Sequence, residues 1–137
     1  MADFITVEMG MEDCPATGSY EGLKYHGYLP AGYLWELVGA DYFIDTGKAA
    51  SATNCNLIKL YDPSGNVMAT ASGAGALIQY NAMTLSSTYT TVDASTAAAR
   101  PYVGLDWSGS GEAVGEGMRV ISVWRARRPA TAAGGLV

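Results

Sequence analysis

The chain has 137 residues, of which 49% are hydrophobic and 15% charged, with a net charge of −5 and an isoelectric point near 4.6. This length fits one domain with its own core, so we expect a single domain over residues 1–137. The acidic balance argues against a general nucleic-acid partner. So few charged residues are typical of a subunit that buries part of its surface in contacts with other subunits. The alternative is a monomer whose surface is covered by small polar residues.

The sequence has few features that indicate a cellular compartment. Cys14 and Cys55 do not have metal-ligand spacing, and no other thiol accompanies them. Met1–Phe4 lacks the basic and apolar regions of a signal peptide. No stretch approaches the roughly 20 apolar residues of a membrane span. We therefore expect synthesis in the cytosol, reduced thiols and no membrane partner.

Short segments of alternating hydrophobicity, which are typical of strands, occur along the whole chain. In chain order the predicted strands are Phe4–Met9, Leu23–Leu29, Tyr33–Ile44 with a break at Gly39, Asn56–Tyr61, Val67–Thr70, Ala76–Met83, Tyr102–Trp107 and Met118–Arg125.

Turn residues separate these strands. Pro30-Ala31-Gly32 turns the chain, residues 45–54 read as a loop, and Asp62-Pro63-Ser64-Gly65-Asn66 predicts a hairpin turn. Asp93–Arg100 is the only helical candidate, because an Asp or Ser cap begins it and Pro101 ends it. About eight short antiparallel strands with at most one short helix predict an all-β fold, a single β-sandwich or jelly-roll-like domain.

Catalytic chemistry has little support. His26 is the only histidine, so any histidine-dependent nucleophile or metal site requires it, and no motif surrounds it. Gly73–Ile78 lacks the third glycine of a dinucleotide-binding loop, and Ser108–Gly111 is not a nucleophile elbow. We expect no enzyme activity, no cofactor and no metal.

Tyrosine and tryptophan dominate the aromatic residues, with nine Tyr and three Trp against two Phe. Their apolar rings and polar groups suit half-buried surfaces and subunit contacts. A carbohydrate-binding face would also use them. However, Trp35, Trp107 and Trp124 alternate in phase with inward aliphatic residues, which favours the core for all three.

The last strand is apolar on both faces, with Met118, Val120 and Trp124 on one and Ile121 and Val123 on the other. Such a strand is either central between layers or exposed to a partner. Basic residues flank it and lead into a tail, 129–137. We expect this tail and the N-terminal segment 1–22 to be contact extensions, and a frayed terminus is the alternative for the tail. The predicted interface residues are Met9, Met11, Arg119, Ile121, Val123, Arg125, Arg127 and Arg128.

Three segments resemble small structural proteins of tailed bacteriophages. Leu29-Pro30-Ala31-Gly32 before an alternating strand is similar to their "LPAG" corner. The segment from Gly115 to Trp124 resembles their closing strand, and Asn56–Tyr61 lies where they carry an "LxLGD"-like strand. Tyr61 stands before Asp62 where that family has glycine.

The resemblance implies a virion component of the capsid decoration (cement) type, located on the capsid surface after assembly in the host cytoplasm. It implies the major capsid protein as partner and a homo-oligomer, with a trimer favoured. A head-fibre or tail component and a carbohydrate-binding module are the alternatives.

Overall fold

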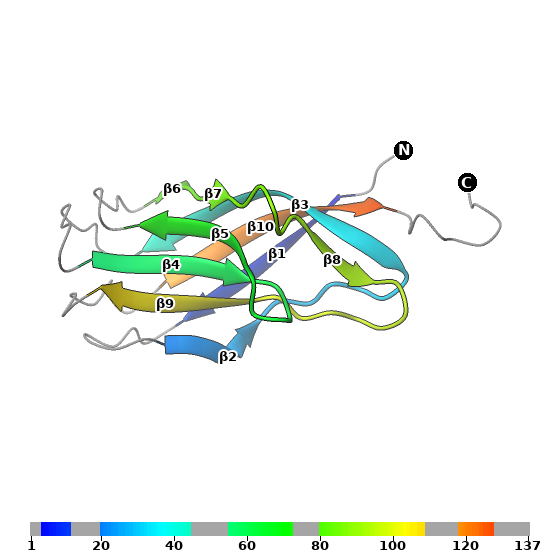
Figure 1. The fold of residues 1–137 in the computed structure, drawn as a ribbon, viewed down its shortest axis with the longest axis horizontal. Helices are drawn as coiled ribbons and strands as arrows, with labels where there is room; N and C mark the ends of the chain where they lie inside the picture. Colours follow the sequence, from blue (N-terminus) through cyan, green and yellow to red (C-terminus); the bar gives the residue numbers. More distant parts are fainter. Residues whose placement is uncertain (1–3, 12–19, 45–54, 73–79, 109–117, 128–137) are drawn as a thin grey trace.

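A computed structural model describes residues 4–11, 20–44, 55–72, 80–108 and 118–127 (Figure 1). The described residues contain ten strands and no helix. The strands are β1 (Phe4–Met11), β2 (Tyr20–His26), β3 (Tyr33–Ile44), β4 (Cys55–Tyr61), β5 (Val67–Ser72), β6 (Tyr80–Ala82), β7 (Thr84–Leu85), β8 (Thr91–Ala94), β9 (Tyr102–Ser108) and β10 (Met118–Arg127).

Two antiparallel sheets form the fold (Figure 1). Sheet A has the order β1-β10-β3-β6, and β8 also pairs with β3. Sheet B has the order β2-β9-β4-β5-β7. This arrangement confirms the predicted all-β fold and is consistent with a β-sandwich.

The segment predicted as one strand, 76–83, is divided where the structure describes it. Residues Tyr80–Ala82 pair with β3 in sheet A, whereas Thr84–Leu85 pair with β5 in sheet B. Met83 lies between these strands, 6% exposed, and its N–H donates to the carbonyl of Ala40. The chain therefore changes sheets at Met83, along one long edge of the sandwich (Figure 1).

The predicted helix at Asp93–Arg100 is wrong. Residues 91–94 form β8 against β3, and Leu29 pairs with Ala99 in an isolated bridge. The carboxylate of Asp93 accepts a hydrogen bond of 2.8 Å from the Ser95 N–H. Asp competes for nearby backbone donors in this way outside helices as well as at their caps, so a capping signal alone does not create a helix.

Both predicted turns are confirmed. At Asp62–Asn66 the Asp62 carboxylate accepts hydrogen bonds from the N–H groups of Ser64 and Asn66, both 2.9 Å, and Gly65 has φ +89°. At the corner after Leu29, Gly32 has φ +108° and its N–H donates to the Ala94 carbonyl at 2.8 Å. Glycine adopts positive φ without the steric cost that a Cβ brings.

A β-bulge divides β3. Leu37 lies opposite Trp124 and Gly39 opposite Val123, so Val38 is an extra residue in the ladder. Before the bulge Trp35 and Leu37 point inward, and after it the even-numbered residues Ala40, Tyr42 and Ile44 do. The break that the sequence predicted at Gly39 is therefore a bulge that keeps one face apolar on both sides of it.

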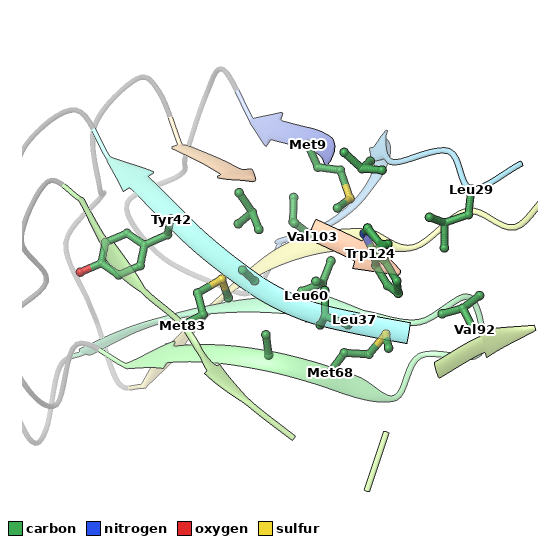
Figure 2. Packing of buried hydrophobic residues seen from close by; sticks show 14 of the residues in the cluster. Met9, Leu29, Leu37, Tyr42, Leu60, Met68, Met83, Val92, Val103 and Trp124 are labelled. Atoms are coloured by element: carbon green, nitrogen blue, oxygen red, sulfur yellow. The ribbon is translucent and has the colours of Figure 1, made fainter. Parts of the chain in front are cut away.

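The core lies between the two sheets. Figure 2 shows Met9, Leu37 and Trp124 of sheet A facing Leu60 and Val103 of sheet B. Trp124, Leu60 and Val103 have no exposed area. Trp35 is 2% exposed, so two of the three tryptophans are confirmed as core residues. The side chain of Trp107 lies outside the described residues.

Candidate functional site

The outer face of sheet A carries most of the predicted interface residues that the structure describes. Along β10, Val120, Ser122 and Trp124 are fully buried. Side chains alternate along a strand, so Ile121 and Val123 point outward, where both are half-buried. Both predicted faces of this strand are confirmed: one fills the core, and the other lies in the middle of the outer face.

Three apolar side chains, Val38, Ile121 and Val123, form what we call the apolar centre. Val38 is the bulged residue and is 38% exposed. Gly39 lies directly opposite Val123, and a Cβ added to it would meet nothing within 4 Å. The missing side chain leaves a shallow open position beside the apolar centre, at which a partner atom can approach the backbone.

Ion pairs flank the apolar centre along the strands. On one side Arg119 of β10 contacts Glu8 of β1 at 3.2 Å, with both side chains more than half exposed. On the other side Glu36 of β3 binds two arginines, Arg125 and Arg127, the latter at 3.2 Å. These three arginines therefore already have carboxylate partners on the same face.

Aromatic rings lie at the margins of this face. Phe4, which is opposite Arg125, is 57% exposed. At the far corner the rings of Phe43 and Tyr80 lie 4.6 Å apart, and Tyr80 is 53% exposed. The outer face thus has an apolar centre, charge pairs along its length and two large exposed aromatic rings.

The predicted interface residues do not all lie on this face. Arg119, Ile121, Val123, Arg125 and Arg127 do, as the alternation of β10 shows. Met9 is a correction: only 2% of it is exposed, and its side chain packs in the core with Val7.

The structure describes the remaining predicted interface residues and the two predicted contact extensions only incompletely. Met11 ends β1 opposite Met118, but its side chain is not described. Arg128 and the tail 129–137 lie outside the described residues. Of the N-terminal segment 1–22, residues 4–11 form an integral strand of sheet A and residues 20–22 begin β2.

Sequence reasoning missed Phe4, Val38 and Tyr80. The exposure of Val38 depends on the bulge, and that of Tyr80 on a strand that changes sheets. A signal for Val38 was present, because it is out of phase with the inward residues Trp35 and Leu37.

Exposed aromatic side chains also occur elsewhere. Tyr28 is 52% exposed, but the guanidinium of Arg100 lies 5.4 Å from the centre of its ring. Tyr61 and Tyr102 stack at 4.9 Å across β4 and β9, and Tyr61 is only 5% exposed. These three tyrosines therefore do not form the open coplanar rings that a carbohydrate-binding face needs.

The described residues also contain few groups that could bind a metal ion. No group of three or more His, Cys, Asp or Glu side chains there is placed to hold a metal ion. The side chain of His26 is outside the described part of the chain. Of the residues described, none belongs to a helix with the length and apolarity to cross a membrane.

Comparison with known proteins gives a weak structural likeness. No protein-family model matches the chain, and no characterised protein matches its sequence. The fold is similar to a chain in the acidic stable capsid structure of Helicobacter pylori bacteriophage KHP30, with a TM-score of 0.40 and 12% sequence identity. The likeness covers 94% of this chain and 95% of that chain. It is too loose to carry a functional argument, which therefore depends on the outer face of sheet A.

Proposed function

We propose that this protein is a structural component of a tailed-bacteriophage virion. In this role it decorates the capsid shell and bridges adjacent major capsid subunits through the outer face of sheet A. The corner after Leu29 and the closing strand β10, which carry the sequence resemblance, support the virion assignment. The function needs no catalytic group, cofactor or metal.

The observation that carries the proposal is the apolar centre, in which Val38 is exposed and Ile121 and Val123 are half-buried on the outer face. Burying apolar surface contributes roughly 25 cal/mol per Å². An interface also loses free energy when charged groups leave water without partners. Here Arg119 and Arg125 are already paired with Glu8 and Glu36, so a partner covers the apolar centre without isolating these charges.

Many copies on one shell would strengthen such contacts. Each contact with a capsid subunit can be weak. Once a chain has bound one subunit, its contact with the adjacent subunit forms at a high effective concentration, which raises the overall affinity for the shell. The hydrogen-bonded sheet holds the apolar centre in place, since β10 is paired on both sides, with β1 and with β3. A rigid surface loses little conformational entropy on binding.

Shell binding tests the proposal directly. Undecorated phage capsids are incubated with the native chain, with Val38→Glu and with Leu85→Glu, and the bound protein is measured by co-sedimentation. Leu85 is a matched control, because it is 39% exposed, close to the 38% of Val38, but lies in sheet B. Burying an unpaired carboxylate should weaken binding of Val38→Glu about tenfold or more.

The proposal is overturned if the native chain does not bind capsids, or if Val38→Glu and Leu85→Glu bind equally well. Far-ultraviolet circular dichroism of each variant shows whether its fold is intact. Labelling of intact virions with an antibody distinguishes the shell from a head fibre or tail.

A further inference from the structure

We propose that two copies of this chain pair edge to edge through β1, with Val7 of one copy opposite Val7 of the other. The pairing would join two copies of sheet A into one continuous antiparallel sheet. This inference is independent of the capsid role.

The structural basis is an edge of sheet A with which no other described strand pairs. Among the described residues, β1 pairs with β10 alone and is the terminal strand of sheet A. Its eight residues, FITVEMGM, pair with β10 without a register shift from Phe4 to Met11. It contains neither proline nor a bulge, which are two of the features by which proteins prevent edge pairing.

The other described edges are protected. The opposite edge of sheet A consists of β6 and β8, with three and four residues. In sheet B, β7 has two residues, and the pairing of β2 with β9 is irregular between Glu21 and His26. Short or irregular edges add a strand poorly. Among the described edges, β1 is therefore the one best suited to add another strand.

Charge does not protect β1 either. Glu8 is its only charged residue, and the carboxylate is paired with Arg119 of β10. The inward side chains Val7 and Met9 are packed in the molecule's own core. An added strand would therefore bind through the backbone of β1 and the outward residues Phe4, Thr6 and Glu8.

A second copy fits this edge. A two-fold axis perpendicular to the sheet keeps the outer faces of both copies on the same side of the joined sheet. A shift of the β1–β1 register by one residue would turn the outer face of the second copy to the opposite side. With Val7 on the axis, Thr6 lies opposite Glu8 of the second copy, and Phe4 lies opposite Gly10. Aromatic residues opposite glycine stabilise antiparallel pairs. A shift that centred the pair on Glu8 would oppose two carboxylates and is disfavoured.

The consequence is a dimer with two apolar centres on one side of a single sheet. A dimer of this kind differs from the trimer that the sequence resemblance implies. Light scattering of the native chain over a range of concentrations should give a monomer–dimer equilibrium. A monomer at every concentration, or a trimer, would overturn the inference.

Cysteine cross-linking tests the register. Directly opposite residues in an antiparallel pair have Cα atoms about 4.5–5.5 Å apart, within the range that a disulfide spans. Thr6→Cys protein is mixed with Glu8→Cys protein and mildly oxidised. Pairing should give on the order of tenfold more cross-linked dimer than either variant mixed with Thr84→Cys, because it raises the local thiol concentration.

Thr84 is the matched control, since it is an exposed threonine on the edge strand β7. The native Cys14 and Cys55 are present in every sample, so their reactions are subtracted by this comparison. Equal cross-linking in all mixtures, or a dimer formed by Thr6→Cys alone, would contradict the Val7-centred pairing.

A second measurement needs no oxidation. Thr6→Asp places a carboxylate opposite Glu8 of the second copy twice in each dimer. Two like-charge cross-strand pairs should raise the dissociation constant about fivefold. Thr84→Asp should leave it unchanged, and an equal effect of the two substitutions would argue against β1 as the dimer edge.

Discussion

The indole N–H of Trp124 donates a hydrogen bond of 2.8 Å to the hydroxyl of Ser122, two residues earlier on the same face of β10. Neither residue has exposed area. The Ser122 hydroxyl in turn donates to the carbonyl of Val7 on β1, at 3.0 Å. This chain of hydrogen bonds joins a fully buried tryptophan to the neighbouring strand and gives every polar atom in it a partner.

Ser122→Ala should therefore destabilise the fold. The substitution leaves the buried Trp124 N–H without its acceptor, which costs about 1–3 kcal/mol in the free energy of unfolding. Urea denaturation followed by tryptophan fluorescence measures this difference. Ser64→Ala, in the exposed turn after β4, is the control and should change stability by less than about 0.5 kcal/mol. Similar losses in both variants would show that the buried hydrogen bonds are not the cause.

Alanine substitutions should lower stability at the two turn glycines but not at the glycine on the outer face. Gly65 has φ +89° and Gly32 has φ +108°, so alanine at either position should destabilise the fold by about 1–2 kcal/mol. Gly39 does not have a positive φ, and a Cβ there meets nothing within 4 Å. Gly39→Ala should therefore change the urea midpoint little. A large loss of stability in Gly39→Ala would show that the bulge at Val38 depends on glycine.

The sequence predicted the strands well where one face is buried. The alternation of Val120 and Trp124 placed β10 with one face in the core, and the hairpin turn at Asp62 followed from local turn residues. Local signals failed where long-range pairing decides the outcome. The sheet change at Met83 depends on β3 and β5 lying in different sheets, which no local pattern shows.

The outer face was predicted only in part for a similar reason. The residues of β10 were identified because this strand is apolar on both faces and has arginines on either side of its apolar residues. Phe4, Val38 and Tyr80 join them only through the pairing of β1, β3 and β6, which requires the register. Met9 illustrates the reverse error, since its own alternation with Val7 indicated the core rather than a contact surface.

Asp93 should titrate below the usual range of a carboxyl group. Hydrogen bonds from the Ser95 hydroxyl and the Ser95 N–H lower the pKa of Asp93. A group with a lowered pKa stabilises the fold above the pKa of its unfolded state, about 3.9. That contribution is lost as the pH falls through the lower folded pKa.

Carboxyl chemical shifts measured by NMR between pH 2 and 6 give this pKa directly. Ser95→Ala removes the first of the two hydrogen bonds, so the pKa of Asp93 should rise toward the unperturbed value. An unchanged pKa in Ser95→Ala would show that the hydroxyl does not hold the carboxylate.

The two ion-pair groups on the outer face should differ in their effect on stability. The side chain of Glu36 is 21% exposed and pairs with two arginines, whereas that of Glu8 is 54% exposed and pairs with one. Glu36→Gln would leave Arg125 and Arg127 as neighbouring like charges on one strand. It should cost about 1 kcal/mol, while Glu8→Gln should cost less than about 0.5 kcal/mol, because exposed pairs are screened by water.

Urea denaturation at low salt and in 1 M NaCl checks this difference. Salt should shrink the effect of both substitutions, since it screens the exposed arginines. If Glu8→Gln costs as much as Glu36→Gln, the double pairing of Glu36 is not what distinguishes the two groups. If the predicted order holds, Glu8→Gln frees Arg119 with little loss of stability. That variant then tests whether a free arginine beside the apolar centre weakens shell binding, as the proposed contact requires.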